Sequence, residues 1–422
     1  MVSRESLASS VDLNSLRAQF PALSETVNGY PAVYFDAPGG TQVPQRVIDA
    51  ISDYLVHSNC NTHGFFRTAE RTDAMLAEAH AAMADLLGSD PDETVFGQNM
   101  TTLTFALSRS IGRELRKGDE IVTTLLDHDA NFAPWKALEE RGVKVHAVRF
   151  HLEDCTLDLD DLKSKLNTRT KLVAVGYASN VVGTINPVKE ITQMAHAAGA
   201  MMFIDAVQYA PHGVIDVRDL DCDFLACSAY KFFGPHVGVL YGKREHLLRL
   251  HAYKVRPAGD TLPDRWETGT LNHEGIAGVT ACVEYLADLG RQASPAAHAR
   301  RDALRAAYGW IHQHDRELAA RLIRGLLNIP GLTFYGIREL ERLDERTPTV
   351  SIRLPNHSPA EVSKRLGDIG IYTWDGNFYG INVTEQLGVE DQGGVLRIGL
   401  CHYSTAEEVD RLLEAMRQLA SS

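Results

Sequence analysis

Two stretches of the sequence decide the fold: Ala200-Met-Met-Phe-Ile-Asp205-Ala-Val-Gln208 and Phe224-Leu-Ala-Cys-Ser228-Ala-Tyr230-Lys231. In each, an apolar run of strand length ends near a charged side chain, Asp205 in the first and Lys231 in the second. Short apolar runs of this kind are typical of strands buried inside a parallel sheet. Ligands bind beyond the carboxyl ends of such strands, so we expect Asp205 and Lys231 to share one site.

Apolar runs of the same kind lie on both sides of these two stretches. From about residue 90 to 245 they alternate with amphipathic segments, as strand–helix–strand units do. Between two of the runs, Ile191, Met194, Ala195 and Ala198 recur at helical spacing, and Gly199 closes the segment, which predicts a crossover helix. The region is therefore predicted to be a doubly wound α/β domain with a mainly parallel sheet. Its predicted strands are 94–96, 120–124, 143–148, 171–177, 200–204, 224–227 and 237–241.

The character of the sequence changes after about Gly290. A long Ala-, Arg- and Leu-rich helical segment is predicted over 296–327, a strand over 350–354 and a helix over 359–369. We expect a large domain over 31–288 and a smaller C-terminal α+β domain over 289–422, joined by the N-terminal segment 1–30. The predicted helix 296–327 carries a cluster of three arginines, Arg300, Arg301 and Arg305. The cluster could form an anion site, but a solvated helix face is the preferred interpretation.

Composition limits the class of protein. The chain has 422 residues, of which 44% are hydrophobic and 23% charged, as in an ordinary globular protein. With 42 Lys and Arg against 55 Asp and Glu, its net charge of −13 disfavours nucleic acid and anionic membrane surfaces as partners. Its six cysteines form no C-x-x-C pair and no zinc-site pattern, so no metal is expected. With no export or membrane segment evident in residues 1–23, a cytoplasmic location is expected.

A phosphate site is suggested where the first predicted strand of the sheet ends. Gly97-Gln-Asn-Met-Thr-Thr102 follows that strand and precedes a helical pattern over 103–115. Asn99 or Thr101 would cap this helix, leaving amide donors and the positive end of the helix dipole for an anion. Taken alone, a polar cap without a ligand is the more common explanation. The two most frequent nucleotide motifs, G-x-G-x-x-G and the Gly-Lys-Ser/Thr loop, are absent.

Three other side chains complete a coherent set. His128 stands between Asp127 and Asp129, which would favour its cationic form, and its ring could stack on a flat cofactor. Asp205, at the end of a buried strand, needs a positive partner such as a protonated ring nitrogen. Lys231, between apolar residues, would be partly desolvated and hence a nucleophile towards carbonyls. A phosphate cradle, Asp205 and Lys231 together predict pyridoxal 5'-phosphate (PLP), held by Lys231 as a Schiff base.

From Tyr34 to Glu408 the sequence resembles the class V aminotransferase group of fold-type I PLP enzymes, particularly the cysteine desulfurase and selenocysteine lyase branch. The resemblance rests on seven stretches in the same order: Tyr34-Phe-Asp-Ala-Pro-Gly-Gly, Asp127-His-Asp-Ala-Asn, Ser179-Asn-Val-Val-Gly-Thr, Asp205-Ala-Val-Gln, Ser228-Ala-Tyr-Lys, Glu267-Thr-Gly-Thr, and Arg397 with Thr405-Ala-Glu-Glu.

This resemblance implies roles for individual residues. Lys231 would bind the cofactor and shuttle the proton, His128 would stack on the ring, and Asp205 would pair with the ring nitrogen. Thr270 would reach the phosphate of a neighbouring subunit, which implies a homodimer with shared active sites. Asn180 and Arg397 would bind the amino-acid end of the substrate, Arg397 through a bidentate grip on its carboxylate. The other implied cofactor contacts are Gln208 to the ring hydroxyl, and Met100, Thr101, Ser228 and Tyr230 to the phosphate.

One departure from the family pattern affects the reaction. Desulfurases of this branch carry a nucleophilic cysteine shortly before the carboxylate-binding arginine, but here that region reads Tyr372-Thr-Trp-Asp-Gly-Asn-Phe-Tyr-Gly-Ile. No cysteine lies between Cys282 and Cys401, and Cys401 is interpreted as a buried structural thiol. Trp374, Phe378 and Tyr379 are instead expected to form an aromatic wall of the pocket.

The preferred function is therefore a PLP-dependent lyase that cleaves the carbon–sulfur or carbon–selenium bond of a cysteine-type amino acid by elimination. One alternative is an epimerase, racemase or aminotransferase acting on an amino acid, because the cofactor scaffold serves all of these reactions. The other alternative is a catalytically silent PLP-binding protein that acts as a partner or sensor.

Overall fold

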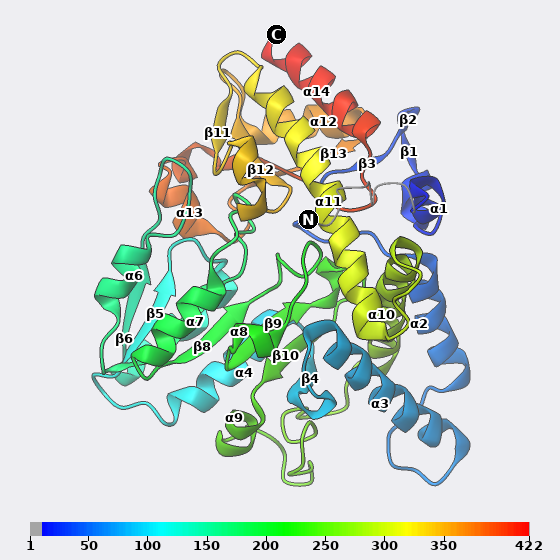
Figure 1. Cartoon of the computed structure of the whole chain (residues 1–422), viewed down its shortest axis with the longest axis vertical. Coiled ribbons are helices and arrows are strands. Elements are labelled where there is room, and N and C mark those ends of the chain that lie inside the picture. The colour runs from blue at the N-terminus through cyan, green and yellow to red at the C-terminus, as the bar shows by residue number, and fades with distance from the viewer. Residues whose placement is uncertain (1–10, 422) are drawn as a thin grey trace.

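A computed structural model of the chain describes residues 11–421 and is dominated by a large seven-stranded sheet (Figure 1). The first ten residues of the predicted N-terminal segment lie outside the described residues. All seven strands predicted for the large domain are present, each within one residue of its expected ends. In spatial order they are β4 (Thr94–Gly97), β10 (Gly238–Gly242), β9 (Phe224–Ser228), β8 (Met201–Asp205), β7 (Thr170–Gly176), β5 (Glu120–Thr124) and β6 (Lys144–Val148).

The sheet is mainly parallel, as predicted, with one exception. Strand β10 pairs antiparallel with both β9 and β4. It follows β9 after a short connection, and a short connection can only return the chain in the opposite direction, because a parallel pairing needs a long crossover. The other neighbouring strands pair in parallel, so β7, β8 and β9 end at the same edge of the sheet. Asp205 and Lys231 are thereby carried to one edge.

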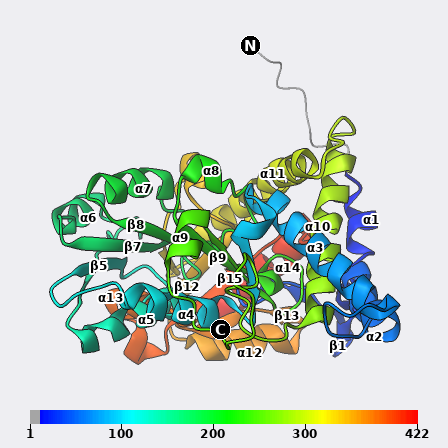
Figure 2. The same ribbon diagram turned by 90° about the horizontal axis from the view of Figure 1, so that it is seen from below.

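Helices cover both faces of the sheet (Figure 2). Successive side chains of its strands enter different cores. In β8, Met202 and Ile204 pack into one cluster of buried side chains and Phe203 into the other, as the period of two in a strand requires. The helices of the first face are α2 (Gln45–His57), α3 (Arg67–Leu87), α6 (Leu159–Lys165), α7 (Val188–Ala197), α8 (Val217–Leu220), α10 (His273–Ala293) and the first half of α11 (Arg300–Leu327). Those of the second are α4 (Met100–Gly112), α5 (Ala133–Lys136) and α9 (Arg244–Arg249).

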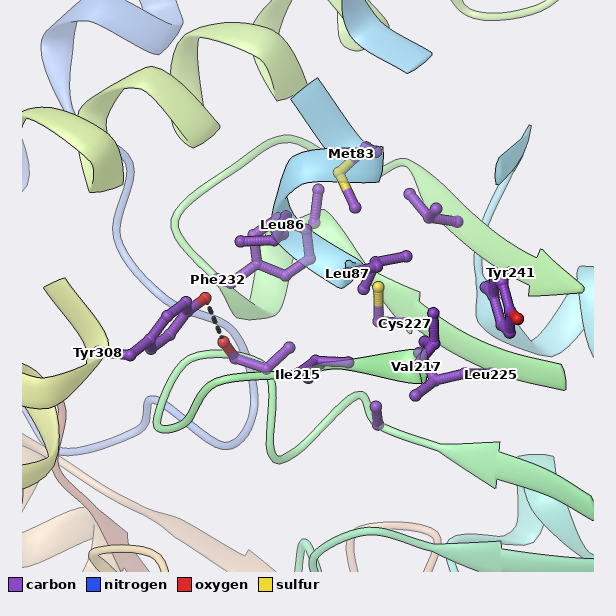
Figure 3. Close-up of a cluster of buried hydrophobic side chains, with 14 of the residues drawn as sticks. Met83, Leu86, Leu87, Ile215, Val217, Leu225, Cys227, Phe232, Tyr241 and Tyr308 are labelled. Carbon is purple, nitrogen blue, oxygen red and sulfur yellow. Dashed lines mark hydrogen bonds between the residues drawn. The ribbon is translucent and has the colours of Figure 1, made fainter. Parts of the chain in front are cut away.

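The core on the first face holds the segment that carries Lys231. Leu225 and Cys227 of β9 lie in one apolar cluster with Leu87 of α3 and with Phe232, which directly follows the lysine (Figure 3). At the side of this cluster the hydroxyl of Tyr308 in α11 donates a hydrogen bond to the carbonyl of Ala210 (2.7 Å). Buried neighbours on both sides of Lys231 therefore fix the position of its backbone.

The second sheet is antiparallel and belongs to the C-terminal half. The predicted strand 350–354 and helix 359–369 are present as β12 (Thr349–Arg353) and α12 (Pro359–Asp368), and the predicted helix 296–327 begins at Arg300 as α11. The sheet order is β11 (Thr333–Tyr335), β12 (Thr349–Arg353), β15 (Val395–Gly399) and β14 (Trp374–Gly376). Packed with it into a separate core are α12 (Pro359–Asp368), α14 (Ala406–Ala420) and the second half of α11. The remaining elements include α1 (Leu13–Arg17), α13 (Ile381–Gln386), the pair β1 (Thr26–Val27) and β2 (Tyr30–Pro31), and the parallel pair β3 (Val33–Tyr34) and β13 (Ile371–Tyr372).

The predicted division at residues 288 and 289 falls inside α10, so one helix runs across it. Val33 and Phe35, from the start of the chain, contribute to the core of the second sheet. The domain boundaries stay a prediction.

The arginine cluster of α11 is neither an anion site nor a freely solvated face. The Arg300 guanidinium is 16% exposed and forms ion pairs with Glu78, Asp85 and Glu284. Its neighbours Arg301 and Arg305 both pair with Asp216. The prediction of a solvated face fits Arg305, whose side chain is 52% exposed, but is wrong for Arg300 and Arg301, because carboxylates and carbonyls from other helices and loops surround their guanidinium groups. Within residues 11–421, no helix is both long enough and apolar enough to cross a bilayer.

Candidate active site

Lys231 lies in the short 3₁₀ turn η6 (Ala229–Lys231) directly after β9, and its side chain is buried. Its Nζ donates a hydrogen bond to the carbonyl of Pro38 and stands 4.9 Å from the ring centroid of Tyr230. Burial, reinforced by the positive charge of Arg397, lowers the pKa of the Lys231 amine to about 7. The sequence predicted such a desolvated lysine. Its buried amine is largely uncharged above pH 7.

This pKa predicts how Lys231 reacts with a small aldehyde. We expect reductive methylation of Lys231 by formaldehyde to accelerate with rising pH, with a midpoint near 7, because only the neutral amine attacks. At pH 7 about half of the Lys231 amines are neutral, against roughly one in three thousand at the ordinary lysine pKa. The measurement is peptide mass spectrometry of the cofactor-free protein after timed labelling, and Lys231→Ala identifies the peptide. A rate that still climbs steeply above pH 9 would contradict the assignment.

Asp205 is the last residue of β8 and is buried, and one of its carboxylate oxygens accepts the backbone N–H of Val207 (2.9 Å). Burial raises the pKa of Asp205 to about 6, while the nearby Lys231 ammonium lowers it. A carboxylate in such surroundings is stabilised by a cationic partner. The expected juxtaposition of Asp205 and Lys231 is therefore present.

His128 differs from its predicted state. Its Nδ1 accepts the backbone N–H of Ala130 (3.0 Å), so that nitrogen carries no proton. Burial, followed by the positive charges of Lys231 and Arg397, lowers the pKa of His128 to about 4. The prediction of a favoured cationic form was wrong, because the Asp127 carboxylate accepts hydrogen bonds from Thr124 and Asn131 in the interior. A neutral ring remains suited to stacking.

The residues of the predicted phosphate cradle lie together at the start of α4. Asn99 caps this helix by accepting the N–H of Thr102 (2.9 Å), and the N–H of Met100 donates to the hydroxyl of Ser228 (3.0 Å). In the described part of the chain, the backbone N–H of Thr101 has no hydrogen-bond partner. Met100, Thr101 and Ser228 thus lie together, with an open amide donor at the positive end of a helix.

Three further residues predicted to contact the cofactor lie in different surroundings: Gln208, Tyr230 and Thr270. The Gln208 side chain is buried and donates to the Thr349 hydroxyl (3.0 Å), a contact from the turn after β8 to strand β12 of the second sheet. The Tyr230 ring stacks on His236 (4.8 Å between centroids), beside Lys231. Thr270 is exposed and has no hydrogen bond within residues 11–421. The structure of a single chain does not bring Thr270 to the other predicted residues.

Arg397 and Asn180, the predicted substrate residues, are in contact. Arg397, in the middle of β15, is buried, and its Nη1 donates to the backbone carbonyl of Asn180 (2.9 Å). Its Nε, like the side-chain oxygen of Asn180, is buried without a hydrogen-bond partner among the described residues. Burial lowers the pKa of Arg397 to about 9. An unpaired buried guanidinium donor is what an incoming carboxylate would satisfy.

The expected aromatic wall is present in part. The Phe378 ring lies on the face of the Arg397 guanidinium, 3.9 Å from Cζ to the ring centroid. The Tyr379 ring stacks on His128 at 5.5 Å. The Trp374 side chain is half-exposed and covers Gly39.

Two residues of the N-terminal stretch belong to the site although sequence reasoning gave them no role. The Pro38 carbonyl holds Lys231, and Asp36 interacts electrostatically with both Lys231 and Arg397. Burial raises the pKa of Asp36 to about 6. The only hint in the sequence was the run Asp36-Ala-Pro-Gly-Gly, which is one of the stretches that match the family. The spacing of its residues does not by itself indicate a catalytic or binding role.

Cys401 is fully buried, and burial raises the pKa of its thiol well above the ordinary range. Such a thiol is not ionised at neutral pH, which agrees with the structural interpretation.

A separate cavity of about 480 Å³ is lined by residues that include Tyr177, Tyr209 and His212, and by none of the predicted site residues.

Comparison with known proteins agrees with this architecture. The aminotransferase class-V family matches residues 33–412. A cysteine desulfurase of Pectobacterium carotovorum is 32% identical, covering 97% of this chain and 98% of that protein. The aminotransferase-like protein FGM3 of Gibberella zeae is 31% identical, covering 98% and 99%. The apo structure of a cysteine desulfurase from Thermococcus onnurineus superposes with a TM-score of 0.86 at 27% identity, covering 97% and 98%.

These matches span nearly the whole chain and include the sheet, the second domain and the connecting helices. They confirm the predicted family and the predicted α/β fold. The chain belongs to the class V aminotransferase family of PLP-dependent enzymes and has their fold-type I architecture.

Proposed function

We propose that this chain is a PLP-dependent lyase that cleaves the carbon–sulfur or carbon–selenium bond of a cysteine-type amino acid by elimination. The observation that carries the proposal is the convergence of Lys231, Asp205 and Arg397 beside a segment, 374–380, that contains no thiol. The relatives named cysteine desulfurase support a sulfur-containing substrate.

The residues present fit the cofactor. The open N–H of Thr101 and the hydroxyl of Ser228 suit its phosphate, and the Asp205 carboxylate suits a protonated ring nitrogen. The Lys231 amine suits its aldehyde, and neutral His128 suits its ring face. Met100, Asn180, Gln208 and Tyr230 would complete the contacts, and Thr270 would reach the partner subunit of a homodimer.

When bound, PLP supplies a protonated ring that takes up the negative charge left on the substrate's α-carbon. Arg397 would hold the substrate carboxylate through its unpaired Nε edge, which fixes the direction of the α-hydrogen. Lys231 Nζ would accept that proton, since its amine is neutral at the pH where a base is needed. His128 is neutral near pH 7, so it adds no positive charge near the Lys231 amine.

Elimination is preferred to sulfur transfer because the site offers no ionised thiol. Each buried cysteine whose thiol pKa is perturbed has it raised by burial: Cys155, Cys222, Cys227, Cys282 and Cys401. In elimination the α-proton passes to Lys231 and the β-sulfur leaves with the bonding electron pair. Addition of water then gives pyruvate and ammonia from cysteine.

The test is to incubate the cofactor-loaded protein with cysteine, cystine, selenocysteine and cysteine sulfinate, and to assay pyruvate and alanine separately. We expect pyruvate with stoichiometric ammonia. Alanine would instead show sulfur or selenium removal by the desulfurase route and would overturn the elimination proposal. If neither product forms, epimerase and aminotransferase substrates become the leading candidates, and a protein that binds PLP yet turns over none of them would be a silent partner.

We further infer a cytoplasmic homodimer, with domains over 31–288 and over 289–422 together with 1–30. The absence of disulfides among the six cysteines supports a reducing compartment. The exposed position of Thr270 supports a role across subunits.

A further inference from the structure

Phe378 and Tyr379 have backbone conformations that non-glycine residues rarely adopt. Their φ angles are 56° and 60°, both in the left-handed region, and they follow one another directly. Two consecutive residues of this kind persist only where the surroundings hold them. The segment is therefore fixed by specific contacts, and these contacts identify its partners.

The first set of contacts joins Phe378 to the substrate residues. Its ring covers the face of the Arg397 guanidinium at 3.9 Å, and its carbonyl accepts the side-chain N–H of Asn180 (2.9 Å). Arg397 in turn donates to the Asn180 carbonyl. The ring fixes the plane of the guanidinium from one face and leaves the Nε edge unpaired.

The second set joins Tyr379 to the predicted cofactor-stacking histidine. The two rings are 5.5 Å apart and 28° from parallel, and the Tyr379 carbonyl accepts the N–H of Asp129 (2.7 Å). The Tyr379 side chain is 73% exposed, so it contributes little to the core. Tyr379 therefore covers one face of the His128 ring and fixes its orientation from the solvent side.

We propose that Phe378 and Tyr379, here called the aromatic clip, are positioning residues that orient Arg397 for an α-carboxylate and His128 for the cofactor ring. The proposal rests on the proposed function, because it uses the same site. The clip lies in the segment where desulfurases of the similar branch carry their nucleophilic cysteine. Through one strained turn it contacts both Arg397, the predicted substrate residue, and His128, the predicted cofactor-stacking residue. It makes the site selective for amino acids over amines that lack a carboxylate.

The Phe378 half is tested with Phe378→Leu, which keeps apolar volume but removes the aromatic face. Cofactor-loaded protein is titrated with L-alanine and with ethylamine, and the change in visible absorbance gives each dissociation constant. We expect the affinity for L-alanine to fall about five- to tenfold and that for ethylamine to stay unchanged. Equal losses for both ligands would overturn the orienting role. Tighter binding of L-alanine would also overturn it, because Phe378 would then be a gate that blocks Arg397.

The Tyr379 half is tested with Tyr379→Ala, with Tyr379→Phe as the conservative variant and Tyr253→Ala as the control at another exposed tyrosine. The readout is the affinity of cofactor-free protein for PLP, followed by absorbance. We expect Tyr379→Ala to weaken PLP binding about fivefold and Tyr379→Phe to restore it, since the ring and not the hydroxyl stacks. A Tyr379→Phe variant as weak as Tyr379→Ala would contradict the proposal.

These titrations do not depend on turnover, so the two proposals fail separately. If Phe378→Leu loses affinity for L-alanine but not for ethylamine while the wild-type protein forms no pyruvate, the lyase assignment fails and the clip stands. A fall in the unfolding temperature of cofactor-free Tyr379→Ala would show that the residue is structural and would overturn its positioning role.

Discussion

Replacing Lys231 with alanine is expected to abolish turnover and to remove the visible absorption band of lysine-bound cofactor. The amine is the group placed to bind the aldehyde of PLP and to take the α-proton, and it is buried next to Asp205 and Arg397. A positioned base alone contributes about 10² to 10⁴ in rate, and loss of the covalent link adds to this. Pyruvate release and the absorbance of the loaded variant are the measurements.

Two controls separate chemistry from folding. Lys231→Arg keeps a cation at the position but cannot supply a neutral amine, so we expect it to be equally inactive. Adding a small primary amine to Lys231→Ala should restore part of the activity, because such an amine fits the space left by the side chain. A Lys231→Ala enzyme within tenfold of the wild-type rate would refute the assignment of this lysine.

The fold could be predicted in most of its detail because its pattern is local. The strands of the large sheet are buried on both faces, so each appears in the sequence as a continuous apolar run with a polar residue after it. The direction of β10 was not predicted, because direction depends on the length of the connection between residues 228 and 238. The helix over 296–327 begins later than expected, since its first residues form a loop before Arg300.

The candidate site was predictable only for residues whose chemistry is evident from their neighbours in the chain. Asp205 and Lys231 stand at strand ends, and strand ends meet in space. The charge of His128 depends on where the Asp127 carboxylate points, which is decided by Thr124 and Asn131 in the folded interior. The contact between Gln208 and Thr349 joins residues that are 141 positions apart, and no spacing in the sequence reveals it.

Replacing Arg397 with lysine is expected to raise KM for an amino-acid substrate about 10- to 100-fold with a smaller change in kcat. The guanidinium has one nitrogen fixed on the Asn180 carbonyl and one face on Phe378, so its remaining edge is held in place for a carboxylate. An ammonium is a point charge that cannot bind both the Asn180 carbonyl and a bidentate carboxylate in this geometry. Loss of one charge-assisted hydrogen bond, about 1.5–3 kcal/mol, corresponds to the expected change.

The matched control is Arg353→Lys, an arginine of β12 in the same sheet whose guanidinium donates to the carbonyls of Gln392 and Gly394 and touches none of the site residues. It should leave KM unchanged. Losing an interaction that binds the ground state and the transition state equally raises KM and leaves kcat unchanged. A rise in KM that exceeds the change in kcat therefore identifies Arg397 as a residue that binds the substrate. An unchanged KM in Arg397→Lys would mean that the substrate presents no carboxylate to Arg397, and the substrate would then be an amine without an α-carboxylate.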